Sequence, residues 1–131
     1  MPTPSAPATV ANDRTRGAAL VEFAMILPIL ILLVFGIIEF GRGYHAKTTL
    51  THAARESVRI AALDTGDPAQ VARDAAPNLD PGAITVVVVP SPCVPGQPVT
   101  VTLEYDHEYA IPLFGSGTWG LEGSGVMRCG G

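Results

Sequence analysis

Four residues at the border of a long apolar run offer the clearest chemistry in this sequence: Gly17, Ala18, Glu22 and Phe23, within the segment RGAALVEF. A secretory signal peptide has a basic region, about 7–15 apolar residues and then a small-residue cleavage site. In this chain the small residue precedes the apolar residues. A peptidase that cut after Gly17 would therefore leave the apolar segment in the mature chain, with Ala18 first and Glu22 fifth.

The carboxylate of Glu22 needs a partner if this segment enters a membrane. An acidic side chain at mid-membrane costs about 2.5–3.5 kcal/mol on insertion scales, and less near the edge. Cleavage after Gly17 would create an α-amino group at Ala18, which carries the opposite charge. The alternative is that Glu22 lies at the interface near a helix N-terminus, where the helix dipole favours an acid.

The apolar run itself extends over residues 18–40 and contains only two charged residues, Glu22 and Glu39. As a helix it is about 35 Å long, and a bilayer core is about 30 Å thick. The 131 residues are 47% hydrophobic and 15% charged, with a mean hydropathy of +0.33, whereas ordinary soluble domains are about 25% charged. The run excludes a plain soluble globule, and the net charge of −4 argues against a nucleic-acid-binding protein.

The elements that position these residues form an α+β protein in four segments. Residues 1–17 are rich in Pro, Ala and Thr and are expected to be a disordered leader. A transmembrane helix over 18–40 continues as an amphipathic extramembrane helix over 41–66, with a flexible point at its first glycines. Residues 67–131 form a small α/β head with one antiparallel sheet.

The head is expected to begin with a short helix over 68–76, with Asp67 as its N-cap and Pro68 in the first turn. The sheet follows from runs of β-branched and alternating residues. The expected segments are a buried strand over 84–89, an alternating strand over 99–105, a Gly/aromatic loop over 111–120 and a last strand over 121–129.

The two cysteines are Cys93 and Cys129. Neither belongs to a CxxC or Cys/His cluster, which argues against a zinc site. An even number of cysteines in a chain with export features favours one disulfide; the alternative is two free thiols in a cytosolic head. A bridge would close a loop of about 37 residues and contribute roughly 4 kcal/mol on the chain-entropy model.

The segment from Arg16 to Arg42, RGAALVEFAMILPILILLVFGIIEFGR, resembles a type IV prepilin processing site, and specifically that of the TadE-like pseudopilins of tight-adherence pilus systems. The continuation THAARESVRIAA and the ending GVMRC resemble the same family. The resemblance is strong over residues 16–62 and extends to the remainder only in layout. It implies that a prepilin peptidase removes the leader after Gly17.

The resemblance also implies a non-enzymatic role as a minor pseudopilin in type IVb pilus assembly. Glu22 and Phe23 would be the assembly residues, because in the family model this Glu pairs with the N-terminal amine of a neighbouring subunit and sets axial register. The implied partners are membrane lipid, the prepilin peptidase, other pilin or pseudopilin subunits and the pilus assembly platform. Neither nucleic acid nor a cofactor is implied.

The family's peptidase is an integral membrane aspartyl protease that acts at the cytoplasmic face. A single-pass cell-membrane protein is therefore expected, with its N-terminus in the cytoplasm and its head outside. The positive-inside rule does not decide the orientation, because Arg14 and Arg16 precede the apolar run while Arg42 and Lys47 follow it. By charge alone the opposite orientation is at least as good; the cleavage motif and the cysteine pair favour an exported head.

The charged residues at the end of the run and beyond it have structural explanations. Glu39 and Arg42, three residues apart, are expected to form an interfacial ion pair. Arg55 and Arg59 share a helix face as a basic collar, and Glu56 can pair with Arg59. The collar is either a solvated or headgroup-facing surface or a strip that docks on acidic partners.

We expect no catalytic, cofactor or metal site. His45 and His52 are roughly aligned on the helix but about 10 Å apart, which is too far to bind one metal together. The DHE triple at residues 106–108 places its side chains on alternate sides of a strand. Phe114 and Trp119 either form an exposed contact surface or close the open end of a small sheet.

Two other functions compete with the pilus assignment. One is a membrane-anchored extracellular binding domain, in which residues 18–40 are an uncleaved signal anchor. The other is a small membrane-linked enzyme, for which the sequence offers no convincing group of catalytic residues.

Overall fold

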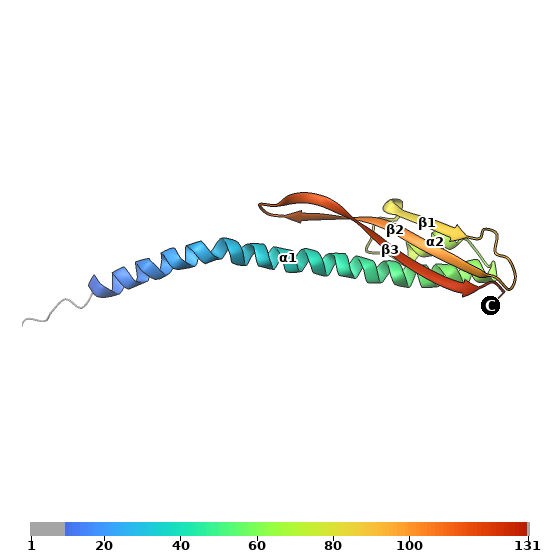
Figure 1. Ribbon diagram of the computed structural model, residues 1–131, viewed down its shortest axis with the longest axis horizontal. Helices are drawn as coiled ribbons and strands as arrows, with labels where there is room; N and C mark the ends of the chain where they lie inside the picture. The colour runs from blue at the N-terminus through green and yellow to red at the C-terminus, as the bar shows by residue number, and fades with distance from the viewer. Residues whose placement is uncertain (1–9, 131) are drawn as a thin grey trace, which may run out of the picture. The chain divides into compact units, whose positions relative to one another are not determined.

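The computed structural model describes residues 10–130, with side chains described from residue 14 onward. The chain forms two compact units, residues 1–37 and residues 38–131. The fold is α+β, as the sequence predicts. In chain order the elements are α1 (Val10–Leu63), α2 (Pro68–Asp74), the 3-10 helix η1 (Pro81–Ala83), β1 (Ile84–Val89), β2 (Pro98–Ile111) and β3 (Gly115–Arg128) (Figure 1).

The first unit contains the N-terminal part of α1. The helix begins at Val10, so residues 10–17, expected in a disordered leader, are helical, while residues 1–9 lie outside the described part of the chain. Residues 10–17 contain no proline, so nothing in them blocks the extension of the apolar helix toward its N-terminus.

The side chains of this unit are largely uncovered. From Arg14 to Ile37 every residue is exposed except Leu32 and Gly36, which are half-buried, and Pro28 lies within the helix. α1 is long and apolar enough to cross a membrane, and none of its most apolar stretch is buried. An apolar surface of this extent around a whole helix is typical of a segment covered by lipid or by other helices.

The second unit is the C-terminal part of α1 with α2, η1 and a three-stranded antiparallel sheet in the order β1-β2-β3. α1 ends at Leu63, and Asp64 adopts φ 52°, the left-handed conformation common after helices. The expected cap of α2 is confirmed, because the Asp67 carboxylate accepts a 2.9 Å hydrogen bond from the Ala69 amide. The glycines early in this part of α1 do not interrupt the helix.

The sheet differs from the prediction in two places. The expected loop over 111–120 is wrong: β2 and β3 pair continuously, with Pro98 opposite Arg128 at one end and Ile111 opposite Gly115 at the other, and only residues 112–114 form the turn. Gly and Ser have little intrinsic preference for strands. Here each such residue of β3 is paired with a residue of β2, and the hydrogen bonds of that pairing keep it in the strand. The strand over 84–89 was expected to be buried, yet Val89 is 61% exposed because β1 is an edge strand with one face toward solvent.

A stripe of mostly small residues on α1 faces the sheet. It recurs at helical spacings of three and four, which place its members on one side of the helix. The buried members, which we call the α1 stripe, are Glu39, Gly43, Ala46, Leu50, Ala53, Ala54, Ser57, Val58, Ala61 and Ala62.

Two glycines of β3 allow the helix to approach the sheet closely (Figure 1). A Cβ added at Gly123 would lie 2.6 Å from the carbonyl carbon of Leu50, and one added at Gly125 would lie 2.8 Å from the carbonyl oxygen of Ala54. These are contacts with backbone, which cannot rotate away as a side chain can. The absence of two Cβ atoms therefore sets the spacing between α1 and β3.

The far end of this unit is closed by the Cys93–Cys129 disulfide, which the structure contains with a Cα–Cα distance of 5.8 Å. The Gly130 amide donates a 2.9 Å hydrogen bond to the carbonyl oxygen of Ala62, and the Cys129 amide donates one of 2.9 Å to that of Gln97. The disulfide therefore joins the segment before β2 to the end of β3, and the Gly130 hydrogen bond ties this end to the last turns of α1. The 36-residue separation corresponds to roughly 4 kcal/mol on the chain-entropy model.

We predict that Gly123→Ala and Gly125→Ala each lower the free energy of unfolding by about 1–3 kcal/mol, because the added methyl group forces α1 away from β3. Thermal and denaturant unfolding of the full chain in detergent measures the effect.

Gly120→Ala is the matched control, since it lies on the same strand and its Cβ would come no closer than 3.9 Å to its nearest neighbour, a carboxylate oxygen of Asp106. This variant should be neutral or more stable by up to about 1 kcal/mol, because alanine reduces the freedom of the unfolded chain. Equal effects at the three positions would show that close approach is not the constraint.

Candidate functional site

The residues predicted for processing and assembly all lie in the first unit, on successive turns of α1. Gly17, Ala18, Glu22 and Phe23 are exposed, and a Cβ at Gly17 would meet nothing within 4 Å. Ala18 and Glu22 are four residues apart on a helix and so share one face. The structure therefore brings the expected new N-terminus and the expected assembly carboxylate together on one accessible helix surface.

Glu22 and Glu39 mark the two ends of the apolar run, and their surroundings differ. Glu22 is exposed. Among the side chains described from residue 14 onward, the structure has an ion pair between Arg42 and Glu39 and none that involves Glu22. Any opposite charge that neutralises Glu22 must therefore come from outside this set, from a processed N-terminus or from another chain.

Glu39 is the first residue of the α1 stripe and is 5% exposed. Its Oε1 accepts a 3.1 Å hydrogen bond from Arg42, which confirms the expected ion pair. The Arg42 side chain is itself 63% exposed, so the ion pair joins a buried carboxylate to an arginine that is in contact with solvent. Glu39 Oε2 is buried without a hydrogen-bond partner among the described residues, which makes the carboxylate dependent on this one arginine.

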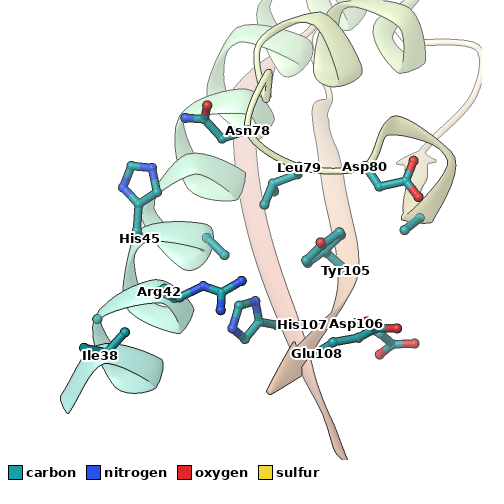
Figure 2. A pocket seen from close by; sticks show the side chains of 13 residues that line it. Ile38, Arg42, His45, Asn78, Leu79, Asp80, Tyr105, Asp106, His107 and Glu108 are labelled. Atoms are coloured by element: carbon teal, nitrogen blue, oxygen red, sulfur yellow. The ribbon is translucent and has the colours of Figure 1, made fainter. Parts of the chain in front are cut away.

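A cleft lies beside this pair, between α1 and β2, with a volume of about 590 Å³. Figure 2 shows Arg42 on α1 directed toward His107 on β2, while His45 points away from His107. Basic and acidic side chains both line the cleft, which gives it no single charge preference. His107 is 6% exposed and its Nε2 has no hydrogen-bond partner in the described part of the chain.

An aromatic group covers the same end of the α1 stripe. The ring of Trp119 lies 6.2 Å from that of His107 and 5.2 Å from that of Tyr109. A Cβ at Gly43 would come within 3.0 Å of the Trp119 indole, so glycine allows the ring to lie directly on α1. Of the two roles considered for Trp119, closing one end of the sheet is therefore the one the packing supports.

The remaining predicted residues lie apart from this group. Arg55 and Arg59 are exposed on α1, and within residues 14–130 the structure has no ion pair between Glu56 and Arg59. Lys47 donates a hydrogen bond to the carbonyl oxygen of Glu122 and helps fix β3 to the helix. Over the same range of residues, no group of three His, Cys, Asp or Glu side chains could hold a metal ion.

Sequence reasoning missed Gly43, Gly123 and Gly125 as packing positions. The signal was present: Gly123 and Gly125 alternate on the strand face that carries Leu121 and Met127, both half-buried. Glycines at alternate positions of a strand often mark a close approach of another backbone.

We predict that Arg42→Met lowers the stability of the full chain by about 1–2 kcal/mol, because it leaves the Glu39 carboxylate covered and unpaired. Methionine keeps much of the apolar stem of arginine, so the change isolates the charge. Differential scanning calorimetry in detergent measures it.

Arg55→Met is the control, because Arg55 is exposed and has no ion pair among the described side chains; its effect should stay within about 0.5 kcal/mol. Adding Glu39→Gln to Arg42→Met should recover part of the loss. No recovery would argue against an electrostatic origin.

Comparison with known families places these residues in context. Residues 17–59 match the family model described as TadE-like protein, which confirms the resemblance noted in the sequence. The match begins at Gly17 and includes Glu22, Phe23 and the Glu39–Arg42 pair. It ends before the sheet. The chain matches no curated protein and no solved structure.

Proposed function

From the match to TadE-like proteins we propose that this chain is a minor pseudopilin-like, non-enzymatic membrane component of tight-adherence, type IVb pilus assembly. The match supports the coarser statement that it is a Tad pilus-related component with an N-terminal apolar helix. The observation that carries the finer proposal is the exposed surface formed by Gly17, Ala18 and Glu22 at the entrance to the apolar part of α1.

In this proposal a prepilin peptidase cuts after Gly17. A helical peptide bond must open before a protease can bind it in an extended form. Glycine within a helix is less favourable than alanine by about 1 kcal/mol, so this part of α1 opens most easily at Gly17. Gly17 also has no side chain nearby that would obstruct the peptidase.

Cleavage gives Glu22 its partner. The new α-amino group at Ala18 is positively charged, and Glu22 carries the opposite charge in an apolar stretch where burial alone would be unfavourable. Pairing the amine of one subunit with Glu22 of its neighbour removes both charges from the lipid and fixes the axial offset between subunits. Phe23, 57% exposed, lies beside this pair and adds apolar contact with the neighbouring helix.

The peptidase and the disulfide both support the proposed orientation. We place the N-terminus in the cytoplasm, where the peptidase acts, and the head outside the cell membrane. The Cys93–Cys129 disulfide supports this choice, because disulfides persist in oxidising compartments and are rare in the cytosol. The partners would be membrane lipid, the peptidase, other pilin or pseudopilin subunits and the assembly platform.

The alternative is a signal-anchored extracellular binding domain that keeps its leader. The cleft beside Arg42 is the feature that such a domain could use. The two proposals differ in what they require of Glu22: an assembling subunit needs its charge, whereas a simple anchor is at least as stable without it.

We therefore predict that Glu22→Ala in the natural host reduces subunit–subunit crosslinks within the membrane and reduces surface pili, because the neighbouring amine loses its counter-charge. Glu22→Gln should behave in the same way, since it keeps the shape and removes the charge. Crosslinking at fixed expression, followed by electron microscopy of surface pili, measures both effects.

Glu56→Ala is the matched control, an exposed acid on the same helix but in the second unit, and it should leave assembly unchanged. Normal assembly of the Glu22 variants, with equal or higher membrane levels, would favour the uncleaved anchor instead.

A further inference from the structure

The turn between β2 and β3 presents apolar side chains to its surroundings. Leu113 is 86% exposed and Phe114 is 73% exposed, and Pro112 beside them is also exposed. We call residues 111–114 the hairpin tip. Exposed apolar side chains that adjoin one another, rather than scattered singly, usually mark a contact surface.

The backbone of the tip holds these side chains outward. Leu113 has φ 73°, a left-handed conformation that residues other than Gly, Asn and Asp rarely adopt. The Phe114 amide donates a 3.1 Å hydrogen bond to the carbonyl oxygen of Ile111 and closes the turn. Glycine would fit position 113 without strain, so leucine is present at a conformational cost that its exposed side chain does not recover in water.

The direction of the hairpin places the tip at one end of the second unit. Gly125 contacts α1 at Ala54, Gly123 at Leu50, and the Trp119 indole lies on Gly43. β3 therefore runs beside α1 in the opposite chain direction to it (Figure 1). This order of contacts places the tip toward Ile38. Ile38 is the first residue of this unit, and the apolar run enters the unit there.

The lengths of the two elements show how far the tip reaches. From Trp119 back to Gly115, β3 covers about 14 Å at 3.4 Å per residue. From Gly43 back to Ile38, α1 covers only about 8 Å. The tip therefore reaches the end of its own unit at which Ile38 lies.

The surface of α1 at this end has the composition of a membrane interface. Phe40 and Tyr44 are 67% and 64% exposed and lie one helical turn apart, and aromatic residues concentrate at the headgroup level of membrane proteins. Arg42, two residues from each of them, lies on a different side of the helix and has a largely exposed side chain paired with Glu39; arginine is also common at membrane interfaces, where its charged head stays in water.

We propose that the hairpin tip inserts into the outer interface of the bilayer and so forms a second lipid contact, in addition to that of the apolar helix. The occupant of this apolar surface is phospholipid, because the tip lies at the end of its unit where the aromatic residues Phe40 and Tyr44 are exposed and where the apolar run joins. The inference rests on the proposed membrane span of α1. Insertion would fix the tilt and rotation of the head over the membrane, and withdrawal of the helix from the bilayer would require the tip to leave it too.

Site-specific tryptophan quenching in lipid vesicles tests the tip directly. The chain has one tryptophan, Trp119, so Trp119→Phe gives a background in which Phe114→Trp supplies the only indole. In phosphatidylcholine–phosphatidylglycerol vesicles that contain phospholipids brominated at shallow acyl positions, we expect strong quenching of the indole at position 114 and a blue-shifted emission. Iodide in the buffer should quench it weakly.

Two reference positions make the outcome specific, and both are exposed in the structure. Val126→Trp, toward the other end of β3, should be quenched by iodide and not by brominated lipid. Phe35→Trp, within the apolar run, should be quenched by lipid brominated deep in the acyl chain. If Phe35→Trp is quenched and Phe114→Trp is not, the tip inference fails while the span stands; if neither is quenched, the span itself fails.

Coverage of the tip by a second copy of this chain is a third outcome and would also overturn the proposal: the indole at position 114 would then be shielded from iodide and from brominated lipid alike. Because Trp119→Phe removes a packed ring, each variant is checked for helical and strand content by circular dichroism. Phe114→Trp in the presence of native Trp119, with the wild-type signal subtracted, repeats the measurement in a chain whose packing is intact.

Discussion

The close approach of β3 to α1 is the constraint on which the second unit depends. Because Gly123 and Gly125 have no Cβ, the β3 backbone lies directly against the backbone of α1 at Leu50 and Ala54. This contact determines which further residues meet: Trp119 lies over Gly43 near one end, and the Cys93–Cys129 disulfide closes the other end next to Ala62. It also directs the β2–β3 hairpin along the helix toward Ile38.

The two acidic residues of the apolar run, Glu22 and Glu39, differ in whether an opposite charge lies beside them. Glu39 is covered by its own unit and is neutralised within it by Arg42, one turn away. Glu22 is exposed, and within the described part of the chain it has no such arginine or lysine. An ion pair within one unit stabilises that unit. An unpaired charge in an apolar surface instead favours association with a chain that carries the opposite charge. The proposed assembly role of Glu22 follows from this contrast.

Local sequence patterns predicted the features that local physics determines. The Asp67 cap and the Glu39–Arg42 pair each depend on residues within one turn, and the apolar run depends on one continuous segment; all three are present. The start of α1 and the extent of the hairpin were not predicted, because composition alone suggested disorder before Ala18 and a loop over 111–120. In the hairpin the strand state of Gly117 and Gly120 comes from pairing with β2 and not from their own preference. The packing role of Gly123 and Gly125 depends on α1, more than 60 residues earlier in the chain.

We propose that the chain is processed after Gly17 and carries an exported head, closed by the Cys93–Cys129 disulfide. The intact mass of the protein, isolated without reduction from the membranes of its own host, tests both parts together. We expect a mass that corresponds to a chain starting at Ala18, lighter by the hydrogens lost when Cys93 and Cys129 form their bond. A chain that retains Gly17 and the residues before it would contradict the processing, and a processed chain with two free thiols would contradict the exported head.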